Sequence, residues 1–151
     1  MANNLNKMQK KNMKKLYIGC ALTKLPPDQK DNFLKMITQI RKELGENFEV
    51  MEFLGITGPS TAMPKMVYDH DIKNSVMKAD YLLAICDHAS LGLGYEIATA
   101  VEKVGIPVLA VAHKDSTVSN LIRGIDHKNF QFMYYDSVED IIKKTLETLT
   151  K

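Results

Sequence analysis

Five short apolar runs alternate with amphipathic segments along this chain, and this alternation limits the fold more than any other feature. The runs are bounded by Gly, Pro or polar residues, which is typical of buried strands. Parallel strands need crossover connections, and these usually pack as helices on both faces of the sheet. The expected strands are residues 15–21, 48–54, 80–86, 106–112 and 129–134.

The segments between the runs have helical spacing of apolar residues. Asp28 is expected to cap the first helix and Gly45 to end it, and Pro64 suits the first turn of the second. The expected helices are residues 29–44, 64 or 65 to 78, 97–104, 118–122, and a last helix capped by residues 137–140 and ending near residue 149. The sequence therefore predicts an α/β fold, a flavodoxin-like or Rossmann-like three-layer sandwich with a five-stranded parallel sheet of order 2-1-3-4-5.

Length and charge fit one domain with a basic extension. A chain of 151 residues with 45% hydrophobic content can bury one sizeable core, so we expect a single domain over residues 15–151. Residues 1–15 contain five lysines and no acid, so the remaining chain has 20 − 5 = 15 basic groups against 18 acidic groups. The net charge of +2 thus comes from this end. We expect residues 1–14 to form a solvated basic tail, with no nucleic-acid partner.

Targeting and metal-binding patterns are not evident. The tail lacks the apolar region of a signal peptide, and no apolar run approaches the ~18 residues of a membrane span, so we expect a soluble cytoplasmic protein without a membrane partner. Cys20 and Cys86 are expected to be buried reduced thiols. His70, His88 and His113 have no metal-ligand spacing, which predicts no metal, although a histidine could assist a leaving group.

The carboxyl edge of the predicted sheet is the expected location of a ligand site. The loops that follow the first four strands meet there, and the loop over residues 55–64 is longer than most strand-to-helix connections. These loops are residues 21–24, 55–64, 87–94 and 113–119.

The stretch from Ser90 to Glu96 links the third strand to the third helix. Gly92 and Gly94 predict a small-residue turn that lets the backbone approach a ligand. Glu96 is expected in the first turn of the helix, where the dipole favours a carboxylate by typically 0.3 to 1 kcal/mol and keeps it ionised. An ionised carboxylate suits a nucleophile. Alternatively, Glu96 only complements the helix dipole.

The segment Asp80-Tyr-Leu-Leu-Ala-Ile-Cys-Asp-His-Ala-Ser-Leu-Gly-Leu-Gly-Tyr-Glu96 resembles the core motif of the nucleoside 2-deoxyribosyltransferase family, which includes the 2'-deoxynucleoside 5'-monophosphate N-hydrolases. The resemblance extends from residues 16–18 to 119–124, and Ser-Leu-Gly-x-Gly-Tyr-Glu is its most specific part. It implies that Glu96 attacks the anomeric carbon, expels the base and forms a glycosyl ester, which water or a second base resolves.

The resemblance also implies roles for residues outside this motif. Tyr17 would hold the nucleophile by a hydrogen bond, where composition alone indicates an ordinary strand aromatic. A family aspartate before the third strand would protonate or bind the departing base. The segment from Asp71 to Asp80 is one residue longer than the family spacing, so either Asp71 or Asp69 could match. We favour Asp71, and the alternative for both is a solvated helix face.

Serine positions in the resemblance concern a substrate phosphate. Ser90 matches the serine of the hydrolases, where transferases commonly have aspartate. Ser119 matches a phosphate-binding serine that the neighbouring subunit supplies, which implies a homodimer with shared sites. Both serines could instead be simple caps or loop residues. A third family serine aligns with Ala21, which leaves Thr23, Lys24 or backbone amides as substitutes.

The expected function is therefore hydrolysis of the N-glycosidic bond of a (deoxy)nucleoside or nucleoside 5'-monophosphate, without a cofactor. Base exchange by a 2-deoxyribosyltransferase is an alternative on the same residues. The second alternative is a non-catalytic nucleotide-binding module, in which Glu96 is structural.

Overall fold

The computed structural model describes residues 12–22, 25–52 and 62–151. Its sheet has five parallel strands in the order β2-β1-β3-β4-β5, so the α/β fold and strand order predicted from the sequence are confirmed. The strands are β1 (Lys15–Cys20), β2 (Glu49–Val50), β3 (Tyr81–Ile85), β4 (Val108–His113) and β5 (Phe130–Tyr135).

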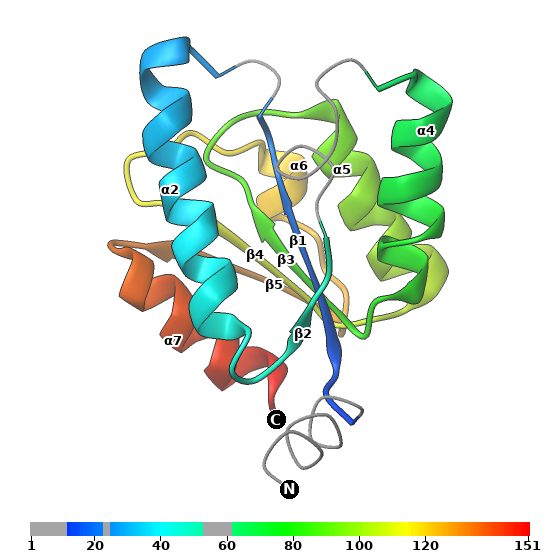
Figure 1. Ribbon diagram of the computed structural model, residues 1–151. Helices are drawn as coiled ribbons and strands as arrows, with labels where there is room; N and C mark the ends of the chain where they lie inside the picture. Colours follow the sequence, from blue (N-terminus) through cyan, green and yellow to red (C-terminus); the bar gives the residue numbers. More distant parts are fainter. Residues whose placement is uncertain (1–11, 23–24, 53–61) are drawn as a thin grey trace, which may run out of the picture.

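Helices lie on both faces of this sheet (Figure 1). One face is covered by α2 (Pro27–Leu44) and α7 (Val138–Leu149), and α4 (Pro64–Tyr68) and α5 (Leu91–Ala98) lie on the other. The short helix α6 (Asn120–Arg123) follows β4. The central strands are almost fully buried, because a parallel sheet covered on both faces has no solvated side.

Several element boundaries differ from the predicted ones. Helix α2 begins at Pro27, so Asp28 is not its cap but an acidic residue of its first turn, and the predicted N-cap was wrong. Gly45 ends the helix as expected, with its N–H donating to the carbonyl of Arg41. Strand β2 has two residues instead of the expected run over 48–54, of which residues 53 and 54 lie outside the described chain.

The second predicted helix begins at Pro64 as expected but is not a continuous α-helix. A π-helical turn over Asp69–Lys73 follows α4, and a 3-10 turn over Val76–Lys78 precedes β3. A π turn inserts one residue into a helix, and such insertions are frequent at functional sites.

Helix α5 begins six residues earlier than predicted, at Leu91 instead of residue 97. Gly92 and Gly94 therefore lie inside the helix, and the predicted small-residue turn was wrong. Ser90 caps it, since its Oγ accepts a hydrogen bond from the Leu93 N–H at 3.2 Å. The buried face of the helix offsets the cost of two glycines in its first turns. A second π turn continues it to Gly105, whose φ of 77° lies in the left-handed region that ends helices.

Candidate active site

Glu96 lies on the buried side of α5, against the middle of β1. Its side chain accepts a hydrogen bond from the Tyr17 hydroxyl, with 3.1 Å between Tyr17 Oη and Glu96 Oε1. Tyr17 is fully buried and Glu96 is 7% exposed. The fold thus brings together two residues that are 79 positions apart in the chain.

Gly19 provides the space for this carboxylate. A Cβ atom on Gly19 would lie 2.7 Å from Glu96 Oε2 and 2.9 Å from Leu93 Cδ1, both closer than real Cβ contacts. The sequence analysis did not identify Gly19. A glycine inside a predicted strand was the available signal, because it often marks the close approach of another group to the backbone.

Burial makes Glu96 harder to ionise. Desolvation, followed by the negative charge of Asp71, raises the pKa of Glu96 to about 8, although the Tyr17 hydrogen bond opposes this shift. The expectation that the helix dipole keeps Glu96 ionised was wrong. Glu96 is the sixth residue of α5 and lies beyond the first turn, where the dipole acts most strongly. Burial also raises the pKa of Tyr17, with Glu96 as the next cause.

The two candidate aspartates have different surroundings in the π turn. Asp69 forms ion pairs with Lys65 and with Lys73, the latter at 2.8 Å between Lys73 Nζ and Asp69 Oδ1. Asp71 instead pairs with His70, with 2.8 Å between His70 Nδ1 and Asp71 Oδ1. The charge of Asp71 acts on both Glu96 and Tyr17. The structure therefore associates Asp71 with the buried pair, whereas Asp69 is engaged by lysines.

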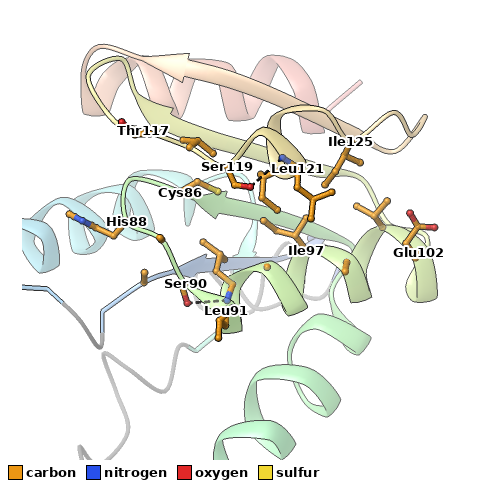
Figure 2. Close-up of a pocket in the computed structure, with 18 residues that line it drawn as sticks. Cys86, His88, Ser90, Leu91, Ile97, Glu102, Thr117, Ser119, Leu121 and Ile125 are labelled. Atoms are coloured by element: carbon orange, nitrogen blue, oxygen red, sulfur yellow. Dashed lines mark hydrogen bonds between the residues drawn. The ribbon is translucent and has the colours of Figure 1, made fainter.

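A cavity of about 750 Å³ lies between α5 and the segment that contains α6 (Figure 2). Four of the predicted substrate-binding residues line it, and its remaining wall is mainly apolar. Glu96, Tyr17 and Asp71 do not line this cavity. The predicted residues on its wall are Ala21, Ser90, Gly94 and Ser119.

The two serines on this wall are helix caps. Ser90 caps α5, and Ser119 caps α6 by accepting the Leu121 N–H at 3.2 Å. A serine hydroxyl that accepts one such bond still has a proton to donate to a ligand. Ala21 contributes no hydroxyl, and Thr117 adds one that the sequence analysis did not identify. Thr23 and Lys24 lie outside the described residues, as does most of the loop 55–64.

Asp87, at the start of the loop that leads to Ser90, joins the carboxyl ends of three strands. Its Oδ1 accepts a hydrogen bond from the His113 N–H at 2.7 Å, and its Oδ2 accepts one from the Tyr135 hydroxyl. Burial and these contacts with Asp87 raise the pKa of Tyr135. This network was not predicted, because its three members are far apart in the sequence.

The side chains of the described residues were compared with the grouping that metal ligands require. Over residues 12–22, 25–52 and 62–151, no three His, Cys, Asp or Glu side chains are grouped as metal ligands would be. Cys20 and Cys86 are free and buried, and burial is the main cause that raises the pKa of each to about 12. No helix within these described ranges is long and apolar enough to span a bilayer.

Sequence comparison finds relatives among nucleotide N-hydrolases. A protein of Thermofilum pendens named as a 2'-deoxynucleoside 5'-phosphate N-hydrolase is 39% identical over 83 residues, which cover 54% of this chain and 57% of that protein. The 5-hydroxymethyl-dUMP N-hydrolase of Danio rerio is 36% identical over 91 residues, covering 58% and 63%. The matched part thus spans about six tenths of each relative's length. No family model matches the sequence.

Solved structures share the fold. The CMP N-glycosidase BcmB of Clostridium botulinum matches with a TM-score of 0.66 and 19% identity, covering 87% of this chain and 96% of that one. A conserved protein of Enterococcus faecalis V583 matches with a TM-score of 0.58 and 20% identity, covering 89% and 98%. These two solved structures show the fold alone. The two sequence relatives are named as nucleotide N-hydrolases, in agreement with the resemblance found in the sequence.

Proposed function

We propose that this protein hydrolyses the N-glycosidic bond of a (deoxy)nucleoside or a nucleoside 5'-monophosphate. The main observation is the buried Glu96 carboxyl, held by the Tyr17 hydroxyl and seated against Gly19. A buried carboxyl with a single defined hydrogen-bond geometry is suited to attack a substrate carbon. The names of the two sequence relatives support the same bond as the target.

The proposed reaction has two displacements. The ionised Glu96 carboxylate forms a bond to the anomeric carbon as the bond to the base breaks. The base takes the electron pair and a proton from the solvent, and the Asp71 carboxylate binds the departing base by a hydrogen bond. Water then attacks the same carbon as the bond to Glu96 breaks, and one proton of that water is released to the solvent, which balances the proton taken up by the base. Because burial raises the pKa of Glu96 to about 8, the rate should increase with pH as this group ionises.

The cavity is the proposed location of the sugar-phosphate end of the substrate. Ser90 and Ser119 can each donate a hydroxyl hydrogen there, next to the first turn of α5. A Cβ on Gly94 would meet no atom within 4 Å outside its neighbouring residues and the backbone of its own helix, so tertiary packing does not require glycine at this position and a ligand can use the space. With Ala21 on the wall instead of a serine, we expect the 5'-phosphate preference to be weak.

We further propose a homodimer in which the partner covers this cavity. Leu91 and Leu121 line the cavity and are 96% and 79% exposed, which is unusual for large apolar side chains on both sides of one groove. A second copy would bury them and bring its own Ser119 toward the site. Leu121→Asp should convert the dimer to monomer in sedimentation or light scattering. A dimer that persists in this variant would contradict the interface.

Release of free base tests the proposed function. The protein is incubated with nucleosides and 5'-monophosphates, with and without an acceptor base, and the products are separated by chromatography. Base release that disappears in Glu96→Ala supports hydrolysis, whereas a new nucleoside formed only with acceptor indicates transfer. Tight binding without turnover would favour a nucleotide-binding module. Full activity in Glu96→Ala would refute the mechanism.

A further inference from the structure

The loop over residues 87–90 connects β3 to α5 and is held by contacts with four other elements. Asp87 is bonded to β4 and β5. The His88 ring packs edge-to-face on Phe33 of α2, with 5.5 Å between the ring centroids. Ser90 caps α5, and the three loop residues after Asp87 line the cavity (Figure 2). A well-anchored loop thus forms part of the cavity wall.

Asp87 makes the most directional of these contacts. Its Oδ1 accepts the His113 N–H at 2.7 Å, and its Oδ2 accepts the hydroxyl of the buried Tyr135. Among the described residues, no lysine or arginine forms an ion pair with Asp87, so these two donors hold it. Hydrogen bonds to a charged group are stronger than neutral ones, and two donors on separate strands fix both the position and the rotation of one carboxylate.

We propose that Asp87 is a positioning residue for substrate binding: through the loop over residues 87–90 it sets the place of Ser90 on the cavity wall. Ser90 Oγ accepts the Leu93 N–H at 3.2 Å, and the Ser90 hydroxyl can donate to a ligand while it keeps this cap. Asp87 does not itself line the cavity, so it acts through Ser90 and not by touching the substrate. The inference rests on the proposed location of the sugar-phosphate end in the cavity.

The kinetic test compares a nucleoside 5'-monophosphate with the corresponding nucleoside. In Asp87→Ala, which loses both contacts, KM for the monophosphate should increase about fivefold while kcat stays unchanged. KM for the nucleoside should stay at its wild-type value, because this substrate has no phosphate for Ser90 to bind. Asp87→Asn should restore most of the wild-type KM. Its amide oxygen can accept the His113 N–H, and its NH₂ group can donate to the Tyr135 oxygen.

A double-mutant cycle shows whether Asp87 acts through Ser90. Asp87→Ala combined with Ser90→Ala should have the same KM as Ser90→Ala alone, since the second change removes the hydroxyl that the first displaces. Tyr135→Phe removes one contact only, serves where Asp87→Ala does not fold, and should increase KM for the monophosphate about twofold. Tyr134→Phe is the matched control at the preceding position of β5 and should leave KM unchanged.

A second measurement needs no turnover. Hydrogen exchange of the Leu93 N–H reports on the Ser90 cap, and we expect this exchange to be about fivefold faster in Asp87→Ala than in wild type. The Asp140 N–H is the internal control, because Ser137 caps α7 in the same way and is not connected to this loop. Its exchange rate should be that of wild type.

Three results would overturn the proposal. The first is an unchanged exchange rate of the Leu93 N–H in Asp87→Ala. The second is a loss of activity that is equal for the monophosphate and the nucleoside, as a merely structural Asp87 would give. The third is a KM effect of Asp87→Ala that adds fully to that of Ser90→Ala. If wild type cleaves neither substrate, the proposed function fails, and the exchange rate still decides whether Asp87 holds the loop.

Discussion

The two sides of α5 present opposite environments. On one side, Glu96 is buried against β1 and bonded to Tyr17, with a pKa raised to about 8. On the other side, Ser90 and the exposed Leu91 border an open cavity. One helix thus carries both a desolvated carboxyl and part of the wall of a cavity that a ligand or a second subunit can cover. We infer that Glu96 and its buried contacts supply the chemistry and that the cavity wall supplies the recognition, and each prediction below changes one of the two.

The largest effect should come from Glu96→Gln, measured as stability against pH. A carboxyl whose folded-state pKa is raised stabilises the fold fully below its unfolded pKa, and this contribution is lost as the pH increases through about 8. Gln stays neutral, so as the pH increases from 4.5 to 9 the free energy of unfolding of the variant should rise by about 5 kcal/mol relative to that of wild type in urea unfolding. Glu147→Gln on α7 is the control, and an equal slope in all three proteins would contradict the burial of a neutral Glu96.

Gly19→Ala should displace the carboxylate without removing it. The added methyl would lie 2.7 Å from Glu96 Oε2, so the side chain must move. A displacement of about 1 Å can cost about 100-fold in rate, and we expect a loss of this order in kcat/KM for base release. The free energy of unfolding should fall by about 1 to 3 kcal/mol. A wild-type rate in Gly19→Ala would show that the close approach of the Glu96 carboxyl to Gly19 is not needed for base release.

Tyr17→Phe should lower the rate by about tenfold at pH 7. The Tyr17 hydrogen bond lowers the pKa of Glu96, so its loss should move the ascending limb of the pH–rate profile to higher pH. The pH–rate profiles of both proteins provide the measurement. Tyr134→Phe removes a hydroxyl from a strand tyrosine that is 40% exposed and should leave the profile unchanged. If the ascending limb of the pH–rate profile does not move in Tyr17→Phe, the Tyr17 hydrogen bond does not set the pKa of Glu96.

The smallest effect should appear on the open side, in Ser90→Ala. Removing this cap should cost about 1 kcal/mol in unfolding free energy. Ser137→Ala is the matched control, because Ser137 caps α7 in the same way by accepting the Asp140 N–H at 3.2 Å. If Ser90 also binds substrate, only Ser90→Ala should increase KM. Equal KM values in the two variants would limit Ser90 to its capping role.

The fold was predictable because apolar periodicity and strand-helix alternation are local properties of the sequence. The start of α5 was not predictable in this way. Burial of Leu93 and Ile97, together with the Ser90 cap, outweighs the weak helix preference of the two glycines in this helix. Ser90 and Ser119 were expected as either caps or ligands, and the structure shows the caps.

The environment of the site was less predictable than its residues. The ionisation of Glu96 was predicted with the wrong direction, because helix position is visible in a sequence and depth of burial is not. The contacts of Gly19 and Asp87 join distant strands, so only the assembled sheet reveals them. The π turn over Asp69–Lys73, too, is visible only in three dimensions.

The stereochemistry of the product tests the central claim most directly. The protein is incubated with a β-nucleoside or its 5'-monophosphate in buffer containing methanol, and the methyl glycoside formed is examined by proton NMR. Attack by Glu96 followed by methanol inverts the anomeric carbon twice, so the account predicts a methyl glycoside with the β configuration retained. An α-methyl glycoside would mean a single displacement by solvent, and would contradict Glu96 as the nucleophile.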